Sequence, residues 1–240
     1  MSLIKTDAFV IHGFKYSESS KIVTLFSKEF GKFSALVKGV RSTKSRSSGV
    51  FENFNKIAVF FNKKDMRSLQ VISKSECINS YGKIKSDLGR LNTAFTIAEY
   101  VNRSTEEYDA NKELYNLVSE LMDYIESSDG GYHNYKLFFL INLSKALGLG
   151  PALKLNDKTK DSIEFGTFQS HTEFKINKEQ YETLKFFDTC KASDILNVKL
   201  EEMHVNDLCD IFEISLVNSL QKLGKLKTKK VFEEIKLNTV

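Results

Sequence analysis

Residues 5–46 read KTDAFVIHGFKYSESSKIVTLFSKEFGKFSALVKGVRSTKSR, and short runs of β-branched and aromatic residues recur along them. Such runs, bounded by Gly, Ser, Asn or charged residues, indicate β-strands. Five runs of this kind occur up to residue 80: 7–14, 21–27, 33–38, 56–62 and 69–74. Closing five antiparallel strands into a small barrel removes their exposed edges and buries one face of each. The sequence therefore predicts an OB-fold five-stranded β-barrel at the N-terminal end.

Beyond residue 81, apolar residues recur at the three- and four-residue spacing of an α-helix. This periodicity predicts helices at 91–101, 114–125, 138–147, 180–187 and 205–223. Residues 156–176 lose the period and contain two short β-like pieces, and the basic end KLGKLKTKK (222–230) is expected to be loosely attached. The predicted fold class is α+β, with the OB-fold domain at 1–80 and a mainly α-helical domain with this β-like insert at 81–240.

The positive charge lies at the N-terminal end. Residues 1–80 contain fourteen Lys or Arg and six Asp or Glu, a net charge of +8, so the remaining residues must sum to −4 to give the chain's +4. A basic end of this kind is where a polyanion is expected to bind. The loop GVRSTKSRSSG (39–49) carries Arg41, Lys44 and Arg46 with no acidic residue, which favours contact with phosphate groups.

Phenylalanine is frequent in the same part of the chain. OB barrels bind single-stranded nucleic acid through a basic groove and aromatic rings on which bases stack. A barrel strand must first fill its interior, however, so the following rings are assigned to the core: Phe26, Phe30, Phe33, Phe51, Phe54, Phe60 and Phe61.

No arrangement of residues indicates catalysis. Neither Gly31-Lys32 nor Gly224-Lys225 is preceded by the glycine that a phosphate-binding P-loop requires. Cys-x-x-Cys, His-x-x-x-His and Gly-x-Ser-x-Gly elements are absent from the sequence, and the acidic residues of the predicted helices have the pattern of solvated faces. The sequence argues against an enzyme, and no catalytic residue or cofactor is predicted.

Three features of the sequence predict a cytoplasmic protein. No apolar run reaches the roughly 18 to 20 residues needed for a membrane span, and the first residues, MSLIKTDAFV, lack the features of a secretory leader. The three cysteines, Cys77, Cys190 and Cys209, are widely spaced, which suits reduced thiols better than a disulfide framework. We expect an intracellular protein without a membrane partner.

The stretch quoted above resembles the N-terminus of the bacterial DNA repair protein RecO family. The shared features are a Tyr-x-Glu-Ser-like turn (Tyr16, Glu18, Ser19), a strand of the form I-V-T-L-F (22–26), Gly31-Lys32, and a Lys-Gly-x-Arg segment (Lys38, Gly39, Arg41). The resemblance extends to LSKALGLGPALKL (143–155), which is similar to the family's Leu-Gly-x-x-Pro-x-Leu segment.

The resemblance implies a recombination mediator in the cytoplasm, associated with the nucleoid. Such proteins bind single- and double-stranded DNA, anneal complementary strands coated with single-strand binding protein (SSB), and with their partner RecR help load the RecA recombinase. The family's basic surface maps onto Lys38 and Arg41, and charge alone adds Lys32, Lys44 and Arg46 to the predicted DNA-binding residues.

A second predicted site receives the tail of SSB. The resemblance implies that this tail is an acidic peptide ending in an apolar residue. Its receptor should therefore be an apolar pocket with a basic rim. Candidates for the rim in the helical domain are Lys136, Lys145, Lys222, Lys225 and Lys227. The alternative is that these lysines belong to solvated helix faces.

The chain departs from the family in one respect. Many members carry four cysteines as a zinc site after the Leu-Gly-x-x-Pro-x-Leu segment, whereas residues 156–176 contain no Cys and one His. Because a structural zinc ion needs about four protein ligands, the chain is expected to be metal-free. Its insert would be held by packing of Ile163, Phe165, Phe168 and Phe174 instead.

Three other functions are considered. An OB-fold RNA-binding protein acting in translation or RNA decay fits the basic barrel equally well, and a preference for DNA with strand annealing would separate the two. A metal-dependent nuclease would need clustered carboxylates, but the acids of residues 1–80 are scattered along the predicted elements. A scaffold without nucleic-acid binding would leave the net charge of +8 unexplained.

Overall fold

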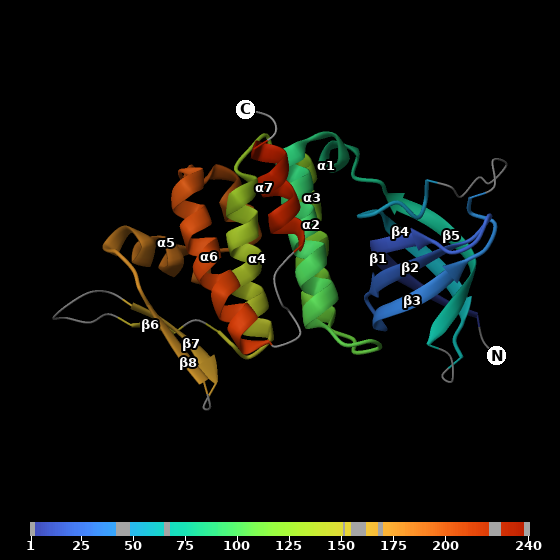
Figure 1. Cartoon of the computed structure of the whole chain (residues 1–240), viewed down its shortest axis with the longest axis horizontal. Coiled ribbons are helices and arrows are strands. Elements are labelled where there is room, and N and C mark those ends of the chain that lie inside the picture. The colour runs from blue at the N-terminus through green and yellow to red at the C-terminus, as the bar shows by residue number, and fades with distance from the viewer. Residues whose placement is uncertain are drawn as a thin grey trace. The chain divides into compact units, whose positions relative to one another are not determined.

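The chain has the predicted α+β fold, with a β-barrel followed by helices and a small sheet (Figure 1). The computed structural model describes residues 3–41, 49–64, 68–150, 152–154, 162–167, 170–220 and 227–237. Two compact units can be distinguished. The first consists of Met1–Lys85 and Ala98–Asn116, and the second of Ser86–Ile97 and Leu117–Val240.

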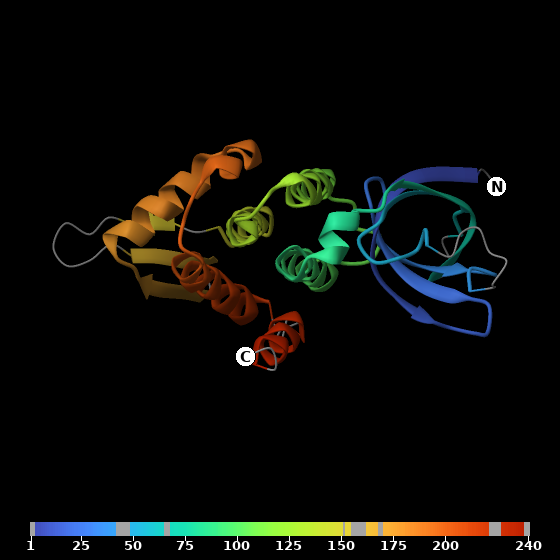
Figure 2. The same cartoon turned by 90° about the horizontal axis from the view of Figure 1, so that it is seen from above.

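The barrel contains five strands, as the alternating sequence predicted. They are β1 (Leu3–Lys15), β2 (Lys21–Ser27), β3 (Gly31–Val37), β4 (Lys56–Asn62) and β5 (Leu69–Asn79). The sheet closes in the order β1-β2-β3-β5-β4, and all neighbours are antiparallel except β3 and β5. This is the strand order of an OB fold, and Figure 2 shows the strands curving around a common centre.

The alternation of β3 explains how the barrel is filled. Phe33, Ala35 and Val37 are buried, while the residues between them are half-buried. The ring of Phe33 stacks on that of Phe61 from β4, with centroids 5.2 Å apart. Burying side chains of this size stabilises the fold by about 2 kcal/mol each. The interior is therefore a packed apolar core.

Part of the barrel's outer surface is covered by residues 98–116. The ring of Tyr115 lies 5.6 Å from Phe9 and 5.9 Å from Phe26, and the Tyr108 N–H donates to the carbonyl of Lys32 at 2.8 Å. This segment lies beyond the predicted boundary at residue 80. The division into domains at 1–80 and 81–240 remains a proposal, and a barrel cut at residue 80 would uncover Phe9 and Phe26.

Gly31 has no side chain, and this lets residues 98–116 approach β3 closely. Its φ is +64°, and a Cβ there would overlap the carbonyl oxygen of Asp109. We expect Gly31→Ala to lower the free energy of unfolding by about 2 kcal/mol, because backbone strain and overlap add. Gly39→Ala is the control, since its φ is +69° with no atom near the added Cβ. Urea denaturation showing equal losses for both variants would contradict the proposed overlap.

Seven α-helices and one 3-10 helix are found in the part of the chain that the structure describes. They are α1 (Gly82–Ser86), α2 (Leu88–Ser104), α3 (Lys112–Ser127), α4 (Tyr132–Ala146), α5 (Lys178–Thr189), η1 (Ala192–Asn197), α6 (Glu202–Ser219) and α7 (Lys227–Leu237). The five predicted helices are confirmed as α2 to α6. α4 packs against α5 and α6 and is buried over most of its length, with Leu137, Phe139 and Leu143 fully buried. None of the described helices is long and apolar enough to cross a membrane.

The basic end of the chain is not loosely attached as predicted, because α7 docks on the helical unit. Phe232 is only 8% exposed and its ring lies 6.3 Å from that of Phe95, while Lys229 pairs with Asp210 at 2.6 Å. The prediction failed because it read residues 222–230 as a basic tail, and the aromatic residue that anchors the helix lies just beyond them. Residues 221–226 lie outside the described part.

The β-like insert forms a three-stranded antiparallel sheet. Its strands are β6 (Ala152–Lys154), β7 (Ser162–Thr167) and β8 (Ser170–Lys175), in that order. The two predicted β-like pieces are confirmed as β7 and β8, and β6 was not predicted. Phe174 is half-buried. Phe168 and the side chains of Ile163 and Phe165 lie outside the described residues, so their packing remains a prediction.

Candidate nucleic-acid interface

A turn after β3 exposes two of the predicted DNA-binding residues. Lys38 and Arg41 are both exposed, and Gly39 between them has a φ of +69°. The N–H of Arg41 donates to the carbonyl of Ser19 at 3.0 Å, and its guanidinium donates to the carbonyl of Ser17. Both acceptors lie in the loop between β1 and β2. The turn is thus fixed against that loop, which holds its charges in one place.

The loop between β1 and β2 is ordered by its own hydrogen bonds. The N–H of Tyr16 donates to the carbonyl of Ser20 at 3.1 Å, and the N–H of Ser20 donates to the Ser17 hydroxyl at 3.2 Å. The side chain of Tyr16 is 61% exposed. In OB barrels this loop is one of those that border the ligand site. Glu18 is the one carboxylate in residues 12–22 and 34–41, so the region keeps a positive charge.

Two lysines face each other where β1 and β2 meet this loop. Lys15 and Lys21 are directly paired across the strands, an arrangement of like charges that destabilises a sheet. The ammonium of Lys21 turns away and donates to the carbonyl of Phe51 at 2.5 Å, and burial lowers its pKa. Lys15 remains exposed. We call Lys15, Lys38 and Arg41 the cationic end of the barrel.

The structure places the other predicted DNA-binding residues differently. Lys32 is half-buried on β3, and its ammonium donates to the carbonyl of Asn102. A lysine held by a carbonyl of its own chain is less available to a phosphate than one in solvent. Lys44 and Arg46 lie outside the described residues, so their contribution remains a prediction.

Most of the phenylalanines assigned to the core are buried, but Phe60 is not part of the barrel's core cluster, and Lys5 and Lys74 lie over its ring. Five are buried, namely Phe26, Phe33, Phe51, Phe54 and Phe61, while Phe30 and Phe60 are half-buried. The exposed aromatic residues of the barrel are instead Phe14, at 51%, and Tyr16. Phe14 was not among the predicted binding residues. The available signal was its place near the end of a predicted strand, one residue before Lys15.

The candidate rim for an SSB tail is partly occupied by ion pairs. Lys136 pairs with Glu213 and Lys145 with Asp188, each at 2.8 Å. Lys227 is exposed at the start of α7, while Lys222 and Lys225 lie outside the described residues. Two of the five predicted lysines are therefore partly neutralised within the protein.

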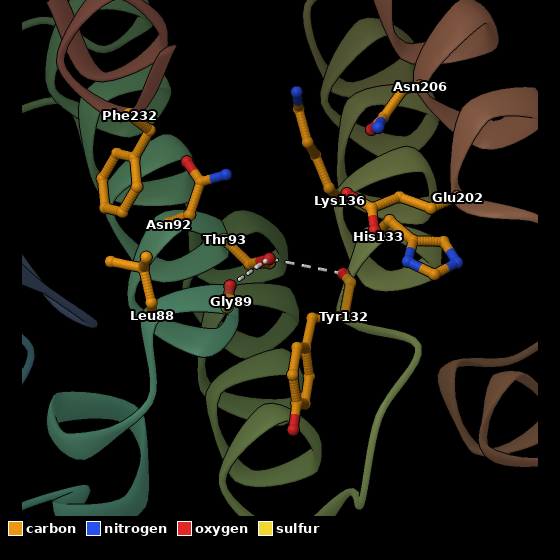
Figure 3. A pocket seen from close by; sticks show the side chains of 10 residues that line it. All are labelled: Leu88, Gly89, Asn92, Thr93, Tyr132, His133, Lys136, Glu202, Asn206 and Phe232. Atoms are coloured by element: carbon orange, nitrogen blue, oxygen red, sulfur yellow. Dashed lines mark hydrogen bonds between the residues drawn. The ribbon is translucent and has the colours of Figure 1, made fainter. Parts of the chain in front are cut away.

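A pocket of about 260 Å³ lies beside Lys136 in the helical unit (Figure 3). Leu88 from α2 and Phe232 from α7 provide apolar walls on one side, and Lys136 and His133 from α4 lie on the other. The Thr93 hydroxyl donates to the carbonyls of Gly89 and Tyr132, at 3.2 and 3.4 Å. The pocket combines apolar walls with a basic group, as the predicted receptor requires.

The family's zinc site is not matched by the residues of this chain. Among the described residues, no group of three His, Cys, Asp or Glu side chains could hold a metal ion. Burial raises the pKa of the Cys209 thiol to about 12 and that of Cys190 to about 11. Because zinc binds the thiolate, these thiols are poor ligands. The chain therefore remains predicted to be metal-free.

The fold and the cationic end define a class of protein, an OB barrel extended by a helical unit. Two family models cover most of the chain: Recombination protein O N terminal matches residues 1–81, and Recombination protein O C terminal matches residues 85–229. The chain belongs to this family, RecO.

Individual relatives carry the same family name. DNA repair protein RecO of Chlorobium limicola is 32% identical over 151 residues, which cover 63% of this chain and 58% of the relative. The protein of that name from Salinibacter ruber is 29% identical over 66% of this chain and 60% of its own length. The match to DNA repair protein RecO of Chloroherpeton thalassium is 22% identical but spans 96% of this chain and 98% of the relative. The first two matches thus reach little more than half of the relatives' length.

Proposed function

We propose that the protein is a DNA repair and recombination mediator that binds single- and double-stranded DNA and anneals complementary strands. The observation that carries this proposal is the cationic end of an OB barrel in a chain of the RecO family. Lys15, Lys38 and Arg41 form a positive surface at the loop that borders the ligand site of such barrels. Affinity for DNA depends largely on phosphate contacts of this kind.

Annealing requires no catalytic group. Two complementary strands repel each other through their phosphates, and a protein that neutralises part of that charge lowers the free energy of their encounter. Holding the strand on an open surface, with its bases unstacked, leaves the bases ready to pair. A cationic, aromatic barrel supplies both functions without bond chemistry, so we propose a protein that is neither an enzyme nor dependent on a cofactor.

We further propose that it works with RecR and with the tail of SSB to help load RecA. The pocket beside Lys136 supports the SSB part of this proposal, because Phe232 and Leu88 give it apolar walls near a lysine. The exposed Lys227 at the start of α7 would add to the basic rim. The ion pairs of Lys136 and Lys145 with Glu213 and Asp188 weaken those two candidates.

An annealing assay tests the proposal. Complementary oligonucleotides are coated with SSB from the same organism, and duplex formation is followed with and without the protein. We expect the protein to accelerate annealing at least tenfold, because phosphate neutralisation lowers the barrier to strand encounter. Parallel titrations with RNA of the same sequence separate this function from RNA binding. A protein that prefers RNA and leaves the annealing rate unchanged would contradict the proposal.

A further inference from the structure

An apolar row crosses the outside of the barrel next to the cationic end. Phe14 on β1 is paired with Ile22 on β2, Ile22 with Leu36 on β3, and Leu36 with Val71 on β5. Residues paired in register lie on the same face of a sheet. These four side chains, here called the apolar row, therefore follow one another across four strands. With strands about 4.8 Å apart, the row is roughly 14 Å long.

The row faces outward and does not belong to the core. On the same strands Val23 and Ala35 fill the interior and are fully buried, so alternation places Ile22 and Leu36 on the opposite face. Phe14 is 51% exposed, and the other three members of the row are half-buried. Apolar side chains that stay partly exposed in a continuous row are uncommon on a protein surface and point to a binding site.

Among the residues that the structure describes, one end of this outer face is covered and the other is open. Phe26 is fully buried although it also points outward on β2, because Tyr115 packs against it with ring centroids 5.9 Å apart. Lys32, paired with Phe26, contacts Asn102 of the same covering segment. At the apolar row, by contrast, Phe14 keeps half of its surface in solvent. The uncovered end is the one that adjoins Lys15 and Lys38.

The surroundings of the row identify its occupant. Lys15 follows Phe14, Lys38 comes two residues after Leu36, and both are exposed. The His12 ring also lies 6.3 Å from that of Phe14. A ligand that fits must combine flat apolar faces with negative charges, and single-stranded nucleic acid does so through its bases and phosphates. Double-stranded DNA has its bases stacked inside and would use only the charges.

We propose that the apolar row is a stacking platform for single-stranded DNA, which deepens and rests on the proposed function. Two or three unstacked bases lie flat along the row, with Phe14 as the main contact, and their phosphates reach the cationic end. The row is one side chain wide on the outside of a barrel, so it covers only one face of each base. Watson–Crick edges remain in solvent, where a second strand can pair with them. The platform thus presents the bases for annealing.

The first test compares Phe14→Ala with Phe186→Ala, a control that removes an exposed phenylalanine, 41% exposed, from the helical unit. We expect Phe14→Ala to weaken binding of an oligothymidine about tenfold, as loss of one stacking contact predicts. Affinity for duplex DNA and the salt dependence of binding should not change, and Phe14→Trp should bind like the wild type. An equal loss for duplex, or no loss for the oligothymidine, would overturn the stacking role.

The second test asks where the base edges point. Kethoxal reacts with the Watson–Crick edge of guanine, so guanines in an oligonucleotide saturated with the wild-type protein should stay reactive. Protection of these guanines would overturn the proposal, because the edges would then face the protein. Failure of the proposed function can be told apart from failure of the platform. In the first case the wild-type protein does not bind the oligonucleotide in the first titration. A wild-type protein that binds while Phe14→Ala binds equally well refutes only the platform.

Discussion

Replacing Lys38, Arg41, Lys44 and Arg46 together by alanine is expected to lower the affinity for single-stranded DNA by about 100-fold at physiological salt. Each lost phosphate contact should flatten the dependence of log affinity on log salt by about 0.7, so four contacts remove about 2.8 from the slope. Lys38 and Arg41 are exposed, and Arg41 is hydrogen-bonded to the β1–β2 loop, which places this turn at the ligand site of an OB barrel. Fluorescence anisotropy at several salt concentrations measures both quantities.

A control variant removes the same charge from other places. Lys112, Lys178, Lys185 and Lys199 are all exposed and lie outside the barrel strands. Replacing these four by alanine lowers the net charge equally, so it should reduce affinity only slightly, through the weaker long-range field. If the variant of the 38–46 loop keeps the wild-type slope, the phosphate site must lie elsewhere on the protein. A change in affinity without a change in slope is expected only for Phe14→Ala.

The barrel could be predicted from the sequence because its signal is local. Alternation within β3 and the runs of apolar residues in β2 and β4 place these strands to within two residues. The covering of the barrel by residues 98–116 could not be predicted in this way. Tyr115 lies in the predicted helix at 114–125, and periodicity does not say that its ring packs on Phe9 and Phe26, 106 and 89 residues earlier.

Charge and hydrophobic pattern alone could not identify all residues of the candidate site. Charge located the basic turn at Lys38 and Arg41, but it could not distinguish an exposed lysine from Lys32, which contacts Asn102. Phe14 was missed for a different reason. The pairing of β1 with β2 shifts register between Val10 and His12, so the residues before and after that irregularity do not follow one alternation. The face that Phe14 occupies becomes visible only from its pairing with β2.

The helical unit contains a buried ion pair whose loss should be costly. Lys136 on α4 and Glu213 on α6 lie 2.8 Å apart, and their side chains are only 16% and 8% exposed. Burial alone would lower the pKa of Lys136, but the neighbouring Glu213 carboxylate helps to raise it above its ordinary value. Lys136 therefore keeps its charge throughout the neutral range. Glu213 also lies 3.5 Å from Lys229, so the larger loss is expected when Glu213 is removed and the buried Lys136 loses its partner. Such a loss destabilises a protein far more than losing a surface pair.

We expect Glu213→Gln to lower the free energy of unfolding of the protein by about 3 kcal/mol. Glu234→Gln is the control, because Glu234 is 60% exposed and lies 3.9 Å from Lys230, so its loss should not be measurable. The double variant Lys136→Met with Glu213→Met should recover most of the stability, since two apolar side chains can replace a buried pair at little cost. Urea denaturation of Lys136→Met, of Glu213→Met and of the double variant measures the coupling between the two sites. If the losses of the single variants simply add, Lys136 and Glu213 do not act as a pair, and α4 and α6 are held together by apolar packing alone.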